Sequence, residues 1–145
     1  MIGGRVLDAT AVHDMTIGGT VYGRALLAFA VAEAMPLVIP AAALQRVWAA
    51  AGDGDYPLLG FLLDLPVTVV VPLDAAAAQR SGILAHPLHA AGATGAGERG
   101  AGGGWDGAAA HTVHVAQARG LAVVTADPGP LHALDPHLQV ELLPT

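Results

Sequence analysis

The segment from Asp106 to Asp127 reads DGAAAHTVHVAQARGLAVVTAD and predicts a helix followed by a buried strand. Its first part, residues 106–119, is rich in alanine, which is the strongest helix former. Gly120 follows at the position after the helix, where a glycine accommodates a left-handed backbone. Residues 122–125 form a short apolar run with β-branched side chains, as in a strand covered on both faces. A helix that leads into such a strand is typical of an α/β fold.

The same alternation of strands and helices extends over the rest of the chain. We predict further strands at residues 5–7, 37–39, 67–71 and 138–142. We predict further helices at residues 23–35, 41–51, 58–63, 74–84 and 128–134. These elements predict a three-layer α/β/α fold, in which a mostly parallel central sheet lies between two layers of helices. A chain of 145 residues suits one domain, which we place at 1–145.

One segment departs from this alternation. Residues 86–104 show no periodicity, and seven glycines fall within residues 92–104, so we predict a flexible loop. Within it, residues 95–100 match the pattern G-x-G-x-x-G. A dinucleotide site needs a strand before this pattern and a helix after it, and the sequence predicts neither. We therefore take the match to be a product of the glycine content.

Composition excludes several classes of protein. The chain has no cysteine, which excludes disulfides and thiolate metal sites, and no lysine, which excludes a P-loop and a Schiff-base enzyme. The net charge is −6, whereas nucleic-acid binders usually carry a basic face. Any contact with RNA is therefore expected to be local, bridged by metal or supplied by a partner. We find no signal peptide and no membrane span, and expect a soluble, cytoplasmic protein.

Aspartates follow two of the predicted strands. Asp8 comes directly after residues 5–7, and Asp127 closely follows the strand that ends at Thr125. In a parallel sheet, ligands bind beyond the carboxyl ends of the strands. Asp106 joins such a site if the fold brings the start of its helix to the same edge. Carboxylates that converge in this way suit Mg²⁺ or Mn²⁺, and the hydroxyls of Thr10 and Thr125 are close enough to hydrogen-bond a ligating carboxylate.

Each aspartate also has a purely structural interpretation. Asp106 is well placed to cap the helix that it begins, and Asp127 precedes a proline, as turn and cap residues often do. Asp8 is harder to explain in this way, because a carboxylate directly after a buried strand is costly without a partner.

Three motifs in this order resemble those of the PIN-domain family. They are Asp8-Ala9-Thr10, Asp106 at the start of an alanine-rich helix, and Thr125-Ala126-Asp127. The resemblance covers nearly the whole chain and is greatest to the VapC-like ribonuclease toxins of toxin–antitoxin pairs. It implies a Mg²⁺- or Mn²⁺-dependent endoribonuclease, with Asp8, Asp106 and Asp127 as catalytic residues and metal ligands. It also implies RNA as the substrate, an antitoxin protein as partner, and a homodimer.

The chain departs from the family at one acidic position. The family usually has a glutamate in the helix after the second strand, where this chain reads PAAALQRVW from Pro40 onward. Arg46 takes the glutamate's position, or Gln45 if the alignment is shifted by one residue. An arginine there can pair with Asp8 or Asp106 and take the role of the cation. The alternative function is therefore a catalytically degenerate PIN-fold module that binds another protein.

Other polar residues are candidates for smaller roles. Arg46 and His111, which lies one turn beyond the start of its helix, are candidate phosphate contacts. His111 and His114 are three residues apart and can share a helix face, although surface histidines are the plainer interpretation. Glu33 and Asp14 are candidate replacements for the missing carboxylate, but no spacing singles them out.

Overall fold

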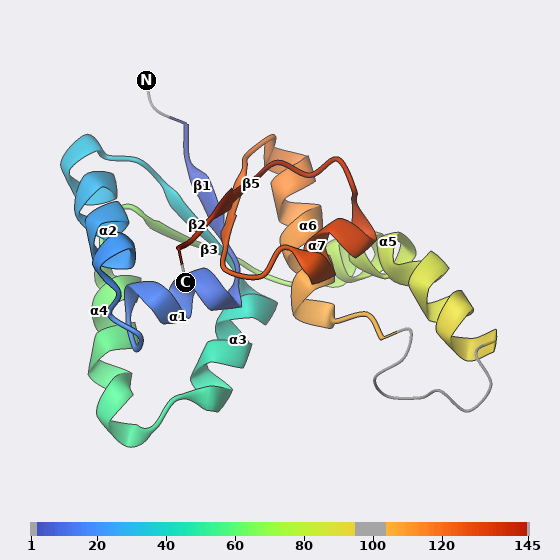
Figure 1. The fold of residues 1–145 in the computed structure, drawn as a ribbon, viewed down its shortest axis with the longest axis horizontal. Helices are drawn as coiled ribbons and strands as arrows, with labels where there is room; N and C mark the ends of the chain where they lie inside the picture. The colour runs from blue at the N-terminus through green and yellow to red at the C-terminus, as the bar shows by residue number, and fades with distance from the viewer. Residues whose placement is uncertain (1–2, 95–103, 145) are drawn as a thin grey trace.

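A five-stranded parallel sheet forms the centre of the protein (Figure 1). The computed structural model describes residues 3–94 and 104–144. Within them the strands are β1 (Arg5–Leu7), β2 (Leu37–Pro40), β3 (Thr68–Val71), β4 (Val123–Thr125) and β5 (Val140–Leu142). Their order in the sheet is β3-β2-β1-β4-β5, and every neighbouring pair is parallel. The predicted α/β class with its parallel sheet is confirmed.

Helices connect the strands and cover the sheet. They are α1 (Ala9–Met15), α2 (Val21–Glu33), α3 (Ala41–Ala50), α4 (Tyr56–Asp64), α5 (Ala75–Thr94), α6 (Gly107–Arg119) and α7 (Gly129–Leu134). A short 3-10 turn, Asp53–Asp55, precedes α4. In the part of the chain that the structure describes, no helix is long and apolar enough to cross a bilayer.

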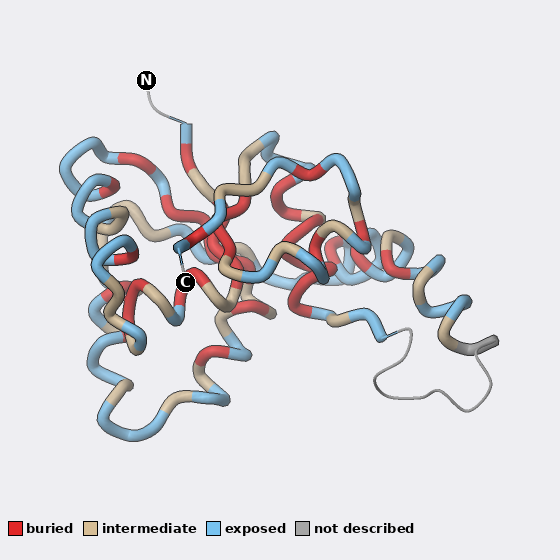
Figure 2. The backbone as a smooth tube through the Cα atoms, in the orientation of Figure 1, coloured by how far each residue is buried: buried red, intermediate tan, exposed pale blue. Residues whose placement is uncertain are grey.

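Successive side chains of the central strands point into two separate hydrophobic cores. In β1, Leu7 packs with buried residues of α1, α2 and α4, whereas its neighbour Val6 packs with residues of α5, α6 and α7. Val124 and Val123 of β4 divide between the two cores in the same way. This follows from the two-residue repeat of a strand. It produces the three predicted layers, with the buried stretches along the central strands (Figure 2).

The edges of the sheet are less covered than the sequence predicts. The run Val69-Val70 in β3 was expected to be buried, yet these side chains are 38% and 42% exposed. β3 is an edge strand, which has a neighbour on one side only. An apolar run therefore identified the strand correctly but not its place in the sheet.

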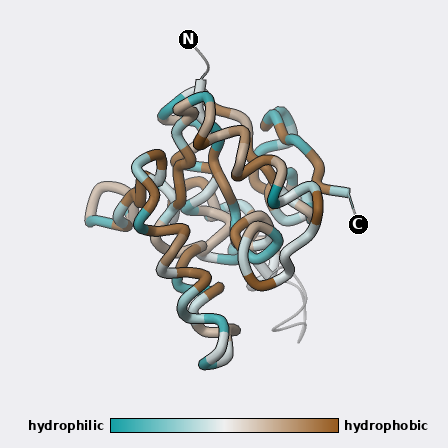
Figure 3. The backbone as a smooth tube through the Cα atoms, turned by 90° about the vertical axis from the view of Figure 1, so that its left-hand side faces the viewer, coloured by the Kyte–Doolittle hydropathy of each residue, from teal (hydrophilic) through white to brown (hydrophobic). Residues whose placement is uncertain are grey.

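Large apolar side chains also remain exposed on α2 and α4. They include Tyr22 and Phe29 of α2 and Leu58 and Phe61 of α4. Figure 3 looks onto the side of the molecule that carries these two helices, and much of their trace is hydrophobic. We refer to these four side chains as the α2–α4 patch. Large apolar side chains exposed in this way are candidates for a protein interface.

Two helical segments differ from the sequence-based expectation. Helix α1 was not predicted, although Ala11, Val12 and Met15 bury one face of it at helical spacing. The loop expected at 86–104 is wrong over its first part, because α5 continues through Pro87 to Thr94. Ala85 is fully buried in the core beside α6, and this packing holds the helix across the proline. Residues 95–103 of that predicted loop, which include the G-x-G-x-x-G match, lie outside the described residues.

Candidate functional site

The order of the strands brings the aspartates together. β1 and β4 are parallel neighbours, with Leu7 opposite Val124, so their carboxyl ends lie at the same edge. After β1 the chain adds β2 and β3 on one side of β1, and it later adds β4 and β5 on the other side. The place between β1 and β4 is therefore a topological switch point, where open α/β sheets bind their ligands. Asp8 directly follows β1, and Asp127 lies two residues beyond β4.

Asp106 reaches the same place from α6. This helix packs against α3 and against the central strands β1 and β2, with its first residue toward the carboxyl edge. A pocket of about 180 Å³ is formed there. Its wall includes all three predicted aspartates, together with Thr10 and Arg46. The remaining lining residues are Ala9, Ala108, Ala109, Thr112, Pro130 and Leu131.

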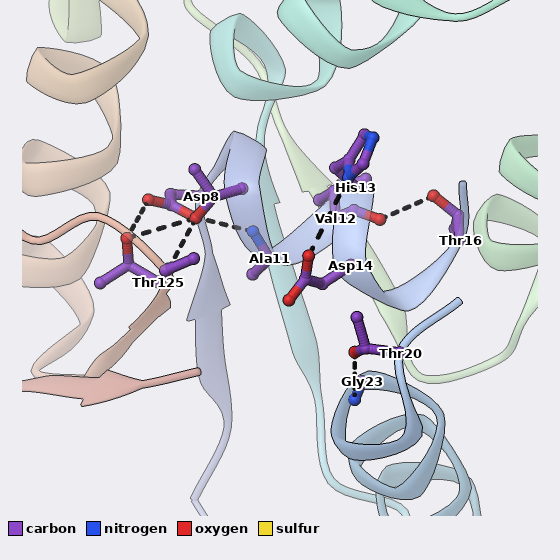
Figure 4. Close-up of polar contacts among 11 residues, drawn as sticks. Asp8, Ala11, Val12, His13, Asp14, Thr16, Thr20, Gly23 and Thr125 are labelled. Carbon is purple, nitrogen blue, oxygen red and sulfur yellow. Dashed lines mark hydrogen bonds and ion pairs between the residues drawn. The ribbon is translucent and has the colours of Figure 1, made fainter. Parts of the chain in front are cut away.

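Asp8 is buried and fully engaged in hydrogen bonds. Its Oδ1 accepts from the Thr10 hydroxyl at 2.6 Å and from the Ala11 backbone N–H at 2.9 Å, so that it caps α1. Its Oδ2 accepts from the Thr125 hydroxyl at 2.5 Å. Figure 4 shows Asp8 between Thr125 and Ala11. The capping role explains why the chain turns into a helix immediately after β1.

The two threonines join the ends of β1 and β4. Thr10 Oγ1 accepts from the Ala126 N–H at 2.8 Å, and Thr125 Oγ1 accepts from the Asp127 N–H at 2.9 Å. A hydroxyl has one proton, and each of these two protons is donated to Asp8. The arrangement therefore suits an ionised Asp8, which accepts every hydrogen bond offered to it.

The pKa of Asp8 is raised above its ordinary value of 3.8, chiefly because burial disfavours the charged form. The hydrogen bonds from the Thr10 and Thr125 hydroxyls and from nearby backbone N–H groups oppose this effect without cancelling it. No ion pair is formed between Asp8 and a cation within the described residues. The desolvation of this carboxylate is thus only partly offset.

This raised pKa predicts how stability depends on pH. The folded state binds the Asp8 proton more tightly than the unfolded state does, so Asp8 stabilises most at low pH. Its contribution should decline as the pH rises from 3.8 through the raised pKa. The free energy of unfolding of wild type, minus that of Asp8→Asn, should therefore fall over this range. Urea unfolding at a series of pH values measures it, and a difference that rises with pH would contradict the assigned shift.

Asp106 is both a helix cap and the partner of Arg46. Its Oδ1 accepts from the N–H groups of Ala108 at 2.8 Å and Ala109 at 3.4 Å, which makes it the N-cap of α6. Its Oδ2 accepts a hydrogen bond from Arg46 Nη1 in a salt bridge. Gln45 is exposed and does not line the pocket, so Arg46 is the one of these two residues that reaches it.

Of the remaining candidate residues, some line the pocket and others do not. Asp127 is exposed on the pocket wall, and its carboxylate has no partner among the described side chains. His111 has no exposed surface and does not line the pocket, so it is out of reach of a phosphate bound there. Its Nδ1 instead accepts from the Ala42 N–H at 3.3 Å. Glu33 and Asp14 do not line the pocket either.

The arrangement does not fit a resident divalent ion. Among the described residues, no group of three histidine, cysteine or acidic side chains is disposed to hold a metal. Both oxygens of Asp8 face hydroxyl donors, and one oxygen of Asp106 faces a guanidinium. The predicted Mg²⁺ or Mn²⁺ thus stays a prediction. The cation that lines this pocket is the guanidinium group of Arg46.

Some members of the pocket were not anticipated from the sequence. Pro130 and Leu131 of α7 and Thr112 of α6 complete its wall. The Thr112 hydroxyl donates to the Ala108 carbonyl at 2.7 Å within its own helix, so it offers the pocket little polarity.

Comparisons with known proteins identify the fold. No family model and no curated protein matches this chain. Three similar solved structures are VapBC2 from Rickettsia felis bound to a promoter DNA fragment, DNA-bound VapBC from Salmonella typhimurium, and VapBC-5 from Mycobacterium tuberculosis. Their identities are 15%, 16% and 21%, and their TM-scores 0.67, 0.66 and 0.53. The alignments cover 99%, 97% and 99% of this chain and 100%, 98% and 98% of the other. The chain therefore shares its fold with chains of these VapBC structures.

Proposed function

We propose that this chain is a toxin-type PIN-fold protein that works by binding a partner protein, with Arg46 in place of a metal ion. The observation that carries this proposal is the salt bridge between Arg46 and Asp106 inside the acidic pocket. The family resemblance expects a ligating glutamate where this arginine stands. Here the position contributes a cation, which neutralises a carboxylate instead of adding one.

Simple electrostatics supports the exclusion of a metal. A pair of like unit charges 4 Å apart costs about 4 kcal/mol at an effective dielectric constant of 20, and a divalent ion doubles the interaction. Arg46 is 58% exposed at its side chain, so solvent reduces this penalty. Even a reduced penalty weighs heavily against an ion that has lost one of its expected ligands.

The α2–α4 patch is the surface that we assign to the partner. Its four large side chains are between 42% and 60% exposed, and Leu58 and Phe61 also line a groove beside α2. Burying such side chains against another chain contributes roughly 25 cal/mol per Å² of apolar surface. The similar solved structures are VapBC complexes, and we transfer to this chain the expectation of an antitoxin-type partner.

Co-expression tests this assignment. We expect the chain to co-purify with the product of a small reading frame immediately upstream of its gene. Phe61→Glu should lower the affinity at least about tenfold, because it places a charge in an apolar interface. Ile83→Glu is the matched control, since Ile83 is 66% exposed on α5, outside the patch. A complex that tolerates Phe61→Glu as well as Ile83→Glu would argue against this surface.

The second candidate is the metal-dependent endoribonuclease implied by the family resemblance. One observation favours it: Asp8, Asp106 and Asp127 all line a single pocket at the carboxyl edge of the sheet. The exposed Arg46 side chain would then move away when metal and RNA bind. This candidate requires Mn²⁺ or Mg²⁺ binding and RNA cleavage that both depend on Asp8, whereas the first candidate requires neither.

A further inference from the structure

We propose that a second pocket, between the start of α5, the middle of α6 and the end of β3, binds a phosphate-type oxyanion. It has a volume of about 390 Å³. The charged and titratable residues that line it are Arg80, Arg119, His114 and Asp74. This proposal is independent of the function assigned to the acidic pocket, with which it shares no lining residue.

The first argument is the distribution of cations. The chain has no lysine, so arginine supplies the fixed positive charge. Three of the arginines that the structure describes have partners, namely Arg5 with Glu141, Arg46 with Asp106, and Arg24 with the Gly19 carbonyl. Arg80 and Arg119 have no hydrogen-bond or ion-pair partner among the described residues. Both line this pocket although they come from different helices.

The second argument is the start of α5. Ala76 and Ala77 in its first turn line the pocket, and the twenty-residue helix directs the positive end of its dipole there. Asp74 competes with an anion, because its Oδ1 accepts from the Ala77 N–H at 2.9 Å. Two guanidinium groups and a helix terminus outweigh this one carboxylate. Guanidinium groups also match the geometry of phosphate oxygens.

Two sources of such an oxyanion differ in charge and size. A phosphomonoester, represented by inorganic phosphate, is largely a dianion at neutral pH. It therefore gains most from a pocket that contains two arginines. A phosphodiester of single-stranded RNA has one charge per phosphate and follows a basic groove instead. The shared chemistry is a tetrahedral phosphate contacted by guanidinium groups.

Nuclear magnetic resonance titrations test the proposal with two probes. Inorganic phosphate and a hexameric oligouridylate are each added to the ¹⁵N-labelled full chain. We expect saturable shifts of the Ala76 and Ala77 amides and of the His114 ring. Tighter binding of inorganic phosphate identifies a monoester site, and tighter binding of the oligouridylate identifies an RNA backbone site. Either result supports the oxyanion pocket.

Matched variants distinguish specific binding in this pocket from non-specific attraction of the anion to positive charge on the surface. The double variant Arg80→Gln, Arg119→Gln should weaken binding at least about tenfold. Arg24→Gln removes an exposed arginine elsewhere and should leave the affinity within about twofold. All three arginines are exposed, so the variants should fold, and unchanged amide shifts elsewhere verify it. The proposal is overturned if neither probe gives saturable shifts at the pocket, or if Arg24→Gln weakens binding as much as the double variant.

Discussion

Replacing Arg46 with glutamate should give the acidic pocket a roughly hundredfold higher affinity for Mn²⁺. The change removes the guanidinium that pairs with Asp106 and adds a fourth carboxylate to a wall that already holds Asp8, Asp106 and Asp127. A change of two charge units beside a divalent ion is worth a few kcal/mol even at an effective dielectric constant of 20. Electron paramagnetic resonance of free Mn²⁺ measures the affinity for both proteins.

Arg46→Gln is the control for this experiment. It removes the positive charge without adding a ligand, so its affinity for Mn²⁺ should lie between those of wild type and Arg46→Glu. Both variants should fold, because the Arg46–Asp106 pair is partly exposed and contributes no more than about 1 kcal/mol. An Arg46→Glu protein that binds Mn²⁺ no better than wild type would mean that Arg46 does not exclude the metal.

Thr125→Val should destabilise the protein by about 2–3 kcal/mol. Valine preserves the shape and suits a strand, so the loss comes from the hydroxyl. That hydroxyl donates to the buried Asp8 Oδ2 at 2.5 Å and accepts from the Asp127 N–H at 2.9 Å. A hydrogen bond to a charged group contributes about 1.5–3 kcal/mol, and here a second one is lost with it. The pKa of Asp8 should also rise further, because this hydrogen bond lowers it.

Thr112→Val separates this effect from the general cost of replacing a buried threonine. Both threonines are completely buried. The Thr112 hydroxyl, however, donates only to the Ala108 carbonyl of its own helix, so its loss should cost less than about 1 kcal/mol. Urea unfolding of the two variants gives the comparison. Equal losses would show that the link between Asp8 and the end of β4 adds no particular stability.

Local signals made much of the fold predictable. The segment 106–127 contains a capping residue, an alanine-rich helix, a terminating glycine and a buried strand, and each of these forms as expected. Gly120 adopts a φ of 64° as the residue that ends α6. Such features depend on a few neighbouring residues, which is why sequence alone predicts them.

Features that depend on distant residues were harder to predict. Pro87 favours a break in a helix, but Ala85 is buried beside α6 and the helix continues. The exposure of Val69 and Val70 follows from the place of β3 at the edge of the sheet, which the apolar pattern does not encode. Tertiary packing decides both cases.

The candidate site was predictable in composition but not in its pairing. The sequence shows that Asp8 and Asp127 follow predicted strands, and the rule for parallel sheets predicts a binding site at the carboxyl edge of the sheet. The pocket that these two residues line forms at that edge. The sequence left open whether Arg46 or Gln45 enters it, and whether an arginine would pair with Asp8 or Asp106. The helical phase of α3 and its contact with α6 select Arg46 and Asp106.

A calorimetric titration of Mn²⁺ into the wild-type protein and Asp8→Asn tests most directly whether Arg46 serves as the cation of the pocket. We predict no binding to wild type at sub-millimolar affinity, and no difference between wild type and Asp8→Asn. Binding in the range of roughly 10⁻⁴ M or tighter that is lost in Asp8→Asn would contradict this account, and would indicate a metal site of the kind that the ribonuclease candidate requires.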